Sequence, residues 1–448
     1  MNTLFLPELR EMLADANRAE LEEFCDALNA GRTAEFMEGL DNEEIWQVLQ
    51  YAPPDRRAEI FGYFEHERQV EMLASHPVEQ AAELVDEISS DDRVDLLQEI
   101  DQPRVEQILQ LLPAEDRRDI QRLQSYKGET AGALMTTEVA MLAENLTVRE
   151  ALDELGRQAS ELETIYYLYV VDENNQLRGI VSTRQLVSRL NRPSLTLGEM
   201  MESDVISVLV TDDQEHVAEK VERFNLLAIP VVDSGRQLLG IITHDDVIDV
   251  VREELEEDAQ RIAAVEPLEQ DFLRIALMSL SYKRGIWLII LFFAALLTAF
   301  ALRHYDQELE TYAWLVAFIP LIISAGGNSG SQSATLVITA MTSGDVKLTD
   351  WPQVLRREAI VSLILGGFLA SIGYAFAIFL APSAFDALVI PFTLLSVIVC
   401  GCLCGAALPI MFKRIGWDPA MMSNPFVAGI VDILGIVIYI NIARMLLG

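Results

Sequence analysis

The feature that most constrains this chain is a polar stretch inside an apolar segment. An apolar run extends from about Tyr312 to Met341, and residues 320–332 within it read PLIISAGGNSGSQ. A run of this length is long enough to cross a lipid bilayer, where every backbone polar group must be satisfied inside the protein. The Gly and Ser residues around Asn328 and Gln332 therefore indicate a segment that faces protein or water instead of lipid.

Two interpretations of this stretch are open from the residues alone. Pro320 can break a helix, and the freed carbonyl groups and side-chain amides would then offer oxygen ligands along a polar path. Alternatively, Gly326 and Gly330 form a GxxxG spacing that lets two helices approach closely, and the stretch is a tight helix crossing. Both interpretations place the segment among other helices.

The last third of the chain contains five apolar segments in total. They cover about 286–302, 312–341, 359–380, 387–412 and 424–443. Each is long enough for a membrane span, and the second is long enough to contain a break. Basic residues mark one set of ends: Lys283, Arg284, Lys347, Arg356, Arg357, Lys413 and Arg414. Only Arg303 and Arg444 lie at the other ends, so the positive-inside rule predicts a cytoplasmic N-terminal part and an outside C-terminus.

Charge is distributed unevenly along the chain. Residues 281–448 contain nine basic and nine acidic residues, so the whole formal net charge of −36 falls in residues 1–280. This argues against nucleic acid or an anionic lipid surface as a partner and favours solvated acidic faces or cation binding. The first twenty residues have no signal-peptide pattern, in agreement with a cytoplasmic N-terminal part.

One carboxylate lies well inside an apolar segment. Asp432 occurs in the sequence SNPFVAGIVDILG, and an ionisable residue at this depth is a candidate functional residue because its burial costs about 2.5 to 3.5 kcal/mol. Asn424 and Ala428 precede it by eight and four residues, so their oxygens share one helical face with it. A protonated Asp432 paired with a neighbouring helix is the structural alternative. Five spans are few for enclosing a pore, and a twofold dimer would place two Asp432 side chains opposite each other.

Residues 1–126 show short amphipathic helical stretches separated by Pro or Asp/Ser clusters. A loose repeat begins at Arg57, Arg93 and Arg117, each of which opens an apolar stretch. Repeated short helices of this kind stack into a superhelix. No catalytic constellation accompanies them, and the five His of the chain include no i, i+4 pair, so an enzyme is not expected.

Residues 131–250 contain an internal duplication. Residues 169–186 align without a gap on residues 230–247, at a constant offset of 61, with seven of eighteen positions identical. Each copy reads as strand, turn, strand and helix start, and the two copies open near Met135 and Met201. This pattern resembles the cystathionine β-synthase (CBS) regulatory module, which occurs in pairs.

CBS pairs that bind adenosine nucleotides use a Thr or Ser followed three residues later by Asp. The second copy has Thr243 and Asp246, whereas the first has Ser182 and Gln185, and Leu226 stands where an aromatic ring would stack on adenine. The resemblance thus makes ATP a possible ligand at Thr243 and Asp246, with these departures against it.

A strongly acidic helix is predicted after the second copy. Between residues 245 and 258, eight of fourteen residues are acidic, and Ile248, Val251 and Leu255 keep near-helical spacing. Like charges at i and i+4 repel by roughly 0.2 to 0.5 kcal/mol each. Simple solvation is one explanation of such a face. The other is that Mg²⁺, which prefers oxygen ligands, bridges it to Asp91 and Asp95 of the N-terminal region. The acidic candidates on the helix are Asp245, Asp246, Asp249, Glu254, Glu257 and Asp258.

The polar stretch also resembles the second transmembrane segment of the MgtE family of bacterial magnesium channels. The matching residues are Pro320, Gly326, Gly327, Asn328, Gly330 and Gln332. The match continues over the segment SSDDRVDLL at 89–97, the CBS pair, and Asn424, Pro425, Ala428 and Asp432.

The resemblance implies a homodimer with the ion path at the subunit interface of the inner (plasma) membrane. Asp432 would hold a partly hydrated Mg²⁺, with Asn424, Ala428, Asn328 and Gly327 contributing to the path. Mg²⁺ bound among the cytoplasmic acidic residues would close the pore, and Asp418 would take part in those sites.

These observations predict a multidomain protein. The expected order is an all-α superhelical domain (1–130), a first CBS domain (131–198), a second CBS domain (199–250), an acidic connecting helix (251–280) and five α-helical membrane spans (281–448). A membrane-anchored sensor and a proton-coupled cation exchanger are the alternative functions. An anchor needs neither a polar span nor Asp432, whereas a protonatable Asp432 would also permit exchange.

Overall fold

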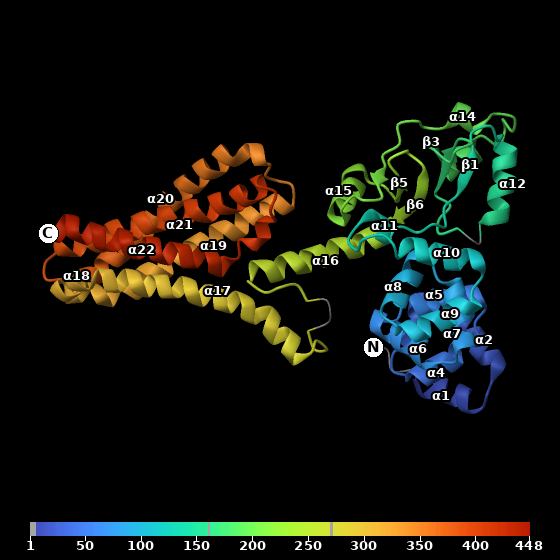
Figure 1. Ribbon diagram of the computed structural model, residues 1–448, viewed down its shortest axis with the longest axis horizontal. Coiled ribbons are helices and arrows are strands. Elements are labelled where there is room, and N and C mark those ends of the chain that lie inside the picture. The colour runs from blue at the N-terminus through green and yellow to red at the C-terminus, as the bar shows by residue number, and fades with distance from the viewer. Residues whose placement is uncertain (1–5, 160–161, 269–271) are drawn as a thin grey trace. The chain divides into compact units, whose positions relative to one another are not determined.

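The computed structural model describes residues 6–159, 162–268 and 272–448 (Figure 1). The chain divides into two compact units, Met1–Val251 and Arg252–Gly448. The predicted ranges 1–130, 131–198 and 251–280 include residues 1–5, 160–161 and 269–271, which lie outside the described residues. Each unit buries hydrophobic clusters of its own.

Short helices make up the first part of the N-terminal unit, in blue to teal in Figure 1. They are α1 (Leu6–Ala14), α2 (Arg18–Ala27), α3 (Ala30–Met37), α4 (Asn42–Leu49), α5 (Pro54–Gly62), α6 (His66–Ser75), α7 (Val78–Glu87), α8 (Ser90–Gln98), α9 (Gln102–Leu111) and α10 (Ala114–Leu123). Local signals set several boundaries. Asp41 and Glu44 form a capping box at α4, and Pro54 occupies the first turn of α5.

Arginine side chains connect successive helices of this stack. Arg57 donates to the carbonyl oxygens of Leu49 and Ala52 at the end of α4, and Arg93 donates to those of Asp86 and Ile88 at the end of α7. A cation is favourable at the C-terminal end of a helix, where carbonyl groups lack intrahelical partners. The arginine repeat in the sequence thus reflects a capping contact at two of its three positions.

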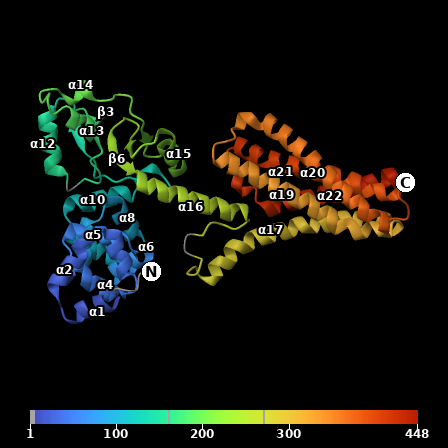
Figure 2. The ribbon, with the colours of Figure 1, turned by 180° about the vertical axis from the view of Figure 1, so that it is seen from behind.

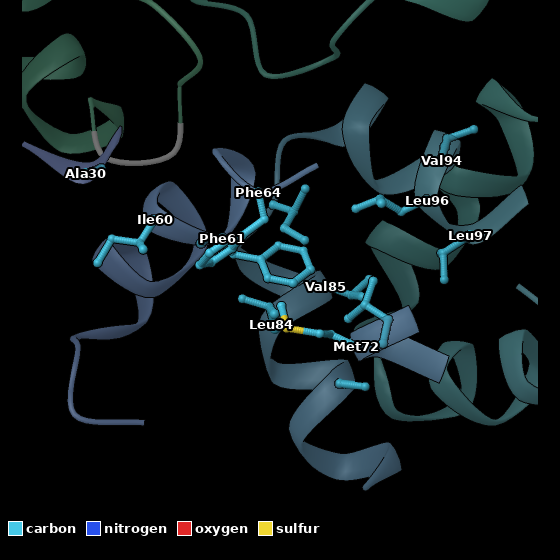
Figure 3. Packing of buried hydrophobic residues seen from close by; sticks show 14 of the residues in the cluster. Ala30, Ile60, Phe61, Phe64, Met72, Leu84, Val85, Val94, Leu96 and Leu97 are labelled. Carbon is cyan, nitrogen blue, oxygen red and sulfur yellow. The ribbon is translucent and has the colours of Figure 1, made fainter. Parts of the chain in front are cut away.

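The core of the stack is built from the apolar faces of these helices. Figure 3 shows Phe61, Met72, Leu84 and Val85 pointing toward one another from neighbouring helices. All four are at most 1% exposed. Burying a side chain of this size contributes roughly 1.5 to 3 kcal/mol, so tertiary packing supports helices too short to be stable alone. This confirms the predicted all-α first domain.

Two small three-stranded sheets follow. Their elements are α11 (Ala131–Leu134), β1 (Met141–Ala143), α12 (Val148–Gln158), β2 (Tyr167–Val171), β3 (Leu177–Ser182), α13 (Thr183–Ser188), α14 (Leu197–Met200), β4 (Val208–Leu209), α15 (Gln214–Phe224), β5 (Ala228–Val232), β6 (Leu238–Thr243) and α16 (His244–Ile262). The sheet orders are β1-β2-β3 and β4-β5-β6, each with one parallel and one antiparallel pair.

The predicted duplication is confirmed at the level of strand register. The strands β2 and β3 begin and end 61 residues before β5 and β6. Both antiparallel pairs carry a register shift at equivalent places, between Val170 and Val171 and between Val231 and Val232. The two copies bury a shared cluster that includes Tyr169 and Ile241.

The acidic helix α16 differs from the predicted range of 251–280. It begins at His244 because Thr243 and Asp246 cap its first turn, and it ends at Ile262. Ala264 has a φ of 59°, in the left-handed region that terminates helices, and Pro267 follows. The helix therefore covers the acidic segment 245–258 that the spacing of apolar residues indicated, but it starts before the predicted domain range and ends well before residue 280.

The second unit contains long apolar helices. They are α17 (Leu277–His304), α18 (Asp306–Thr311), η2 (Ala313–Phe318), α19 (Ile319–Thr342), η3 (Leu348–Asp350), α20 (Trp351–Leu380), η4 (Asp386–Leu388), α21 (Val389–Arg414), η5 (Pro419–Met421) and α22 (Asn424–Leu447). Among the described residues, five segments are long and apolar enough to cross a membrane. They match the five predicted spans, and Figure 2 shows their helices from behind.

The predicted helix break within the polar stretch is wrong. Pro320 lies in the first turn of α19, and α19 then continues without interruption through Gly327 and Asn328 to Thr342. The change of helix type falls earlier, where the 3-10 helix η2 meets α19 at Ile319. Proline is favourable in a first helical turn because the backbone N–H groups there have no intrahelical partner, so the N–H that proline lacks is not missed. The backbone carbonyls of the stretch thus remain within a helix.

Candidate ion path and cation-binding surface

The helices α19 and α21 pack backbone to backbone through glycines. A Cβ atom added to Gly401 would lie 2.6 Å from the Gly326 carbonyl oxygen, and one added to Gly405 would lie 2.1 Å from that of Gly330. These distances are too short for any side chain, so the glycines permit the contact. The close-packing interpretation of Gly326 and Gly330 is therefore correct for this face of α19.

A second face of α19 meets the predicted carboxylate on α22. A Cβ atom at Gly327 would lie 3.2 Å from Asp432 Oδ1 and 3.4 Å from the Ala428 Cβ. Asn424, Ala428 and Asp432 are partly exposed and follow one another at intervals of four residues along α22. The structure thus places Gly327, Ala428 and Asp432 together, and α19 serves both as a packing helix and as a polar one.

Asn424 is held by two hydroxyl residues that the sequence analysis did not identify. Ser331 Oγ donates to the Asn424 carbonyl oxygen at 3.0 Å, and Thr335 Oγ1 lies 3.0 Å from Asn424 Oδ1. Ser331 and Thr335 are separated by one helical turn of α19. This spacing was a usable signal, because it continues the polar face that includes Gly327 and Asn328.

Asn328 is exposed on α19, and its Nδ2 donates to Ser324 Oγ at 3.2 Å. It lies beside Gly327 in sequence, yet no contact joins its side chain to Asp432 within the described residues of one chain. Its role in the path therefore stays a prediction.

The cytoplasmic candidates begin with a buried carboxylate on α8. Asp91 is 8% exposed, and its Oδ1 has no hydrogen-bond partner among the described residues. Burial raises the pKa of Asp91 well above its usual range, and the charges of Asp246, Asp92 and Glu163 raise it further. The structure therefore brings Asp91 and Asp246 within electrostatic range of each other, and their role in binding a cation stays a prediction.

The neighbouring acidic residues extend this surface. Burial, and then the charges of Asp245 and Asp92, raise the pKa of Asp246 to about 6. Asp92 in turn lies within electrostatic range of Asp245 and Asp249. Asp92 and Glu163 were not among the predicted residues. Asp92 adjoins Asp91 in the sequence and could have been found there, whereas nothing in the sequence marks Glu163.

Asp95 is exposed on α8, one helical turn after Asp91. Within the described ranges, no group of three or more His, Cys, Asp or Glu side chains is arranged to hold a metal ion. Mg²⁺ retains several waters and often binds through one or two carboxylates, so a hydrated ion does not require such a group.

The remaining regulatory candidates lie in the second unit. Arg261 forms ion pairs with Glu257 and, at 2.6 Å, with Asp418 Oδ2. Asp418 Oδ1 accepts a hydrogen bond from the Ala420 backbone at 2.8 Å and caps η5. Glu254 and Asp258 belong to the same helix, α16. Both Asp418 oxygens thus have protein partners, so a cation there would have to displace Arg261.

Thr243 and Asp246 contact each other. Thr243 Oγ1 donates to Asp246 Oδ2 at 2.5 Å, and the Thr243 backbone N–H donates to the same oxygen at 3.2 Å. At the matching place in the first copy, Ser182 and Gln185 form a full capping box. The Thr-x-x-Asp pattern therefore has a local structural role as a helix cap.

Comparison with known proteins agrees with this architecture. Residues 28–129 match the MgtE intracellular N domain, 131–192 and 197–253 match CBS domains, and 319–442 match the family described as divalent cation transporter, MgtE. The magnesium transporter MgtE of Thermus thermophilus is 35% identical over 347 residues, covering 78% of this chain and 76% of that protein. The chain belongs to the MgtE family of magnesium transporters.

Other MgtE proteins support the assignment. The magnesium transporter MgtE of Enterococcus faecalis is 36% identical over 340 residues, covering 74% of this chain and 72% of that protein. The solved soluble part of a magnesium transporter matches with a TM-score of 0.52 and 37% identity, over 55% of this chain and 97% of that one. The MgtE family consists of transporters and not of enzymes, as the sequence predicted.

A further solved structure is the cytosolic domain of the Mg²⁺ channel MgtE in complex with ATP. It matches with a TM-score of 0.50 and 34% identity, over 54% of this chain and 98% of that one. The N-terminal unit of this MgtE protein therefore has the fold of a cytosolic domain that binds ATP in a relative.

Proposed function

We propose that this MgtE protein is a homodimeric Mg²⁺ channel, closed when Mg²⁺ binds to its cytoplasmic acidic surfaces. The observation that carries the conduction proposal is the close approach of Gly327 of α19 to Asp432 of α22, where a Cβ atom added to Gly327 would lie 3.2 Å from Asp432 Oδ1. A carboxylate is costly at membrane depth and is retained where it serves an ion pathway.

The exposure of the proposed path supports the proposed dimer. Asn424, Ala428 and Asp432 remain partly exposed in one chain, although α22 lies among apolar helices. A second copy related by a twofold axis would cover this face and place two Asp432 carboxylates on opposite sides of one path. Two carboxylates with polar neighbours suit a divalent cation that keeps part of its water shell.

The gate is proposed to depend on charge neutralisation. Asp91 and Asp246 lie within electrostatic range of each other in a partly buried part of the N-terminal unit, and they repel each other when both are ionised. Mg²⁺ bound between these residues would favour the closed arrangement, and its loss would favour the open one. A ligand shifts such an equilibrium by its difference in affinity for the two states. Asp95, Asp245 and Asp249 would add to this surface.

The orientation follows the positive-inside rule. The N-terminal unit would lie in the cytoplasm, the five spans in the bacterial inner membrane, and the C-terminus outside. The acidic surfaces are then exposed to Mg²⁺ in the cytoplasm. The cytoplasmic Mg²⁺ concentration is the quantity that a Mg²⁺ uptake channel must sense.

The conduction proposal is tested by Mg²⁺ flux into liposomes containing the full chain. Asp432→Asn should reduce the flux at least tenfold, because the amide keeps the shape and removes the charge. Glu310→Gln, which neutralises an exposed carboxylate in α18, serves as the control and should leave the flux unchanged. Equal flux in the wild type and Asp432→Asn proteins would reject Asp432 as the pore ligand.

ATP is a second proposed ligand, favoured by the ATP complex of a similar cytosolic domain. Thr243 and Asp246 would meet the ribose, which requires their mutual hydrogen bond to open or to be shared. Titration calorimetry of the full chain with ATP, in the wild type and in Thr243→Ala, tests this. Heat of binding that disappears in the variant supports the site, and no heat in the wild type rejects it.

A further inference from the structure

Thr335 lies between two carbonyl oxygens. Its Oγ1 is 3.0 Å from the Ser331 backbone oxygen and 3.0 Å from Asn424 Oδ1. A hydroxyl group has one proton and two lone pairs, so Thr335 can donate to only one of these oxygens. The other oxygen would then lie 3.0 Å from Thr335 Oγ1 with no proton between them, and two acceptor atoms would face each other.

One rearrangement removes this approach of two acceptor oxygens. Turning the Asn424 amide by 180° exchanges its oxygen and nitrogen with almost no change in shape. Asn424 Nδ2 then donates to Thr335 Oγ1, and Thr335 donates to the Ser331 carbonyl oxygen. The Asn424 backbone stays fixed by its hydrogen bond from Ser331 Oγ.

We infer that Thr335 is a positioning residue that directs the carbonyl oxygen of the Asn424 side chain away from α19 and into the ion path. Asn424 shares one face of α22 with Ala428 and Asp432, which lie four and eight residues later. On this face the freed oxygen accepts hydrogen bonds from the water shell of a divalent cation. With the opposite orientation the amide would present N–H groups to the cation, which repel it.

The inference rests on the proposed Mg²⁺ channel function, and it concerns affinity for the ion and not gating. Losing the hydroxyl removes one hydrogen bond from Asn424 and lets its amide adopt both orientations. Thr335→Val should therefore raise the Mg²⁺ concentration for half-maximal flux by about three- to tenfold. Thr335→Ser keeps the hydroxyl and should retain the wild-type value.

The control is Thr342→Val on the same helix. Within the described residues, the Thr342 hydroxyl donates only to carbonyl oxygens of α19 itself, those of Ile338 and Thr339. Its removal should leave the half-maximal concentration unchanged. If valine at 335 prevents folding in detergent, Thr335→Ala removes the same hydroxyl without a β-branch.

A double-mutant cycle distinguishes positioning from general support of the fold. Asn424→Asp has an oxygen at both ends of the side chain, so its orientation no longer matters. Adding Thr335→Val to Asn424→Asp should then change the Mg²⁺ concentration for half-maximal flux by less than twofold. The same substitution should raise that concentration about three- to tenfold in the wild-type background.

The outcomes separate this inference from the proposed function. If the wild type conducts Mg²⁺ and Thr335→Val has the same half-maximal Mg²⁺ concentration as the wild type, the inference is overturned and the channel proposal is kept. An equal loss in the Asn424→Asp background overturns it as well, since the hydroxyl would then act without the amide. Absence of Mg²⁺ flux in the wild type rejects the channel function itself.

Discussion

Asp91 is the residue at which we propose that ion binding is linked to the stability of the N-terminal unit. Its carboxylate is buried on α8, where Asp246 from another element of the same unit adds a second negative charge. A buried charge without an opposite partner destabilises a fold, and a bound cation removes that cost. The same residue that weakens the junction without Mg²⁺ is therefore suited to strengthen it with Mg²⁺.

Neutralising Asp91 should replace the effect of the cation. In EDTA, we expect Asp91→Asn to stabilise the full chain against unfolding by about 1 to 3 kcal/mol, because repulsion with Asp246 is lost. The stabilisation by added Mg²⁺ should decrease in the same variant. Thermal unfolding in detergent, with and without Mg²⁺, measures both effects.

Asp15→Asn is the matched control, since Asp15 is exposed after α1. A lower melting temperature for Asp91→Asn than for the wild type in EDTA would show that the Asp91 charge supports the junction by itself. The proposed gate would then lose its physical basis.

The titration of two carboxyl groups predicts a pH dependence. Burial, with nearby acidic charges, raises the pKa of Asp246 to about 6 and that of Glu138 to about 7. For an acid whose pKa is raised on folding, the folded state binds protons more tightly, so stability increases as pH falls through the folded pKa. The increase is complete below the unfolded values, near pH 4.

In EDTA, the free energy of unfolding should therefore increase as the pH is lowered from 8 to 5. The protection factors of the α8 amides in the full chain, which divide out the intrinsic pH dependence of hydrogen exchange, should increase over this range. The increase should be smaller in Asp246→Asn, which removes one titrating group. Protection factors that are lower at pH 5 than at pH 8 would contradict the assigned shifts.

At the scale of elements, α19 combines two tasks on two faces. Its glycines approach the backbone of α21, while Gly327, Ser331 and Thr335 face α22. The sequence analysis treated these as alternatives because one-dimensional spacing does not show which neighbour each face meets. Small residues permit close packing, and the same small residues leave room for a polar path.

Gly405→Ala should destabilise the packing of α19 on α21. Its Cβ would lie 2.1 Å from the Gly330 carbonyl oxygen, so the helices must separate, at a cost of roughly 1 to 3 kcal/mol. Gly367→Ala in α20 is the matched control because nothing lies within 4 Å of its Cβ position, and helix propensity favours alanine. Denaturant unfolding in mixed micelles compares the two. Equal stability of both variants would contradict the backbone contact.

Element boundaries followed from the sequence where a local signal was present. The five spans were predicted from hydropathy, and the two CBS copies from an offset of 61 residues that the strands keep. The acidic segment 245–258 was predicted to be helical and lies within α16, but the predicted domain range ran on to residue 280 because the helix end depends on the left-handed backbone of Ala264. Periodicity of apolar residues does not encode that end.

At the scale of the whole chain, acidic residues and long apolar segments are separated along the sequence. All of the net negative charge precedes residue 281, and the apolar spans follow it. The sequence could therefore predict a cytoplasmic acidic part and a membrane part. It could not predict contacts such as Thr335 with Asn424, since residues 89 positions apart in the chain meet only through helix packing.

The central claim is that the transported ion also closes the path. Mg²⁺ flux through the full chain in liposomes tests it directly. The Mg²⁺ concentration on the cytoplasmic face is set near zero and then to about 10 mM, which exceeds the dissociation constant of weak divalent-cation sites, about 1 mM. The account predicts rapid flux at low cytoplasmic Mg²⁺ and at least a severalfold decrease at high Mg²⁺, measured at the same driving force. Flux that stays the same at both concentrations would contradict a gate closed by its own ion.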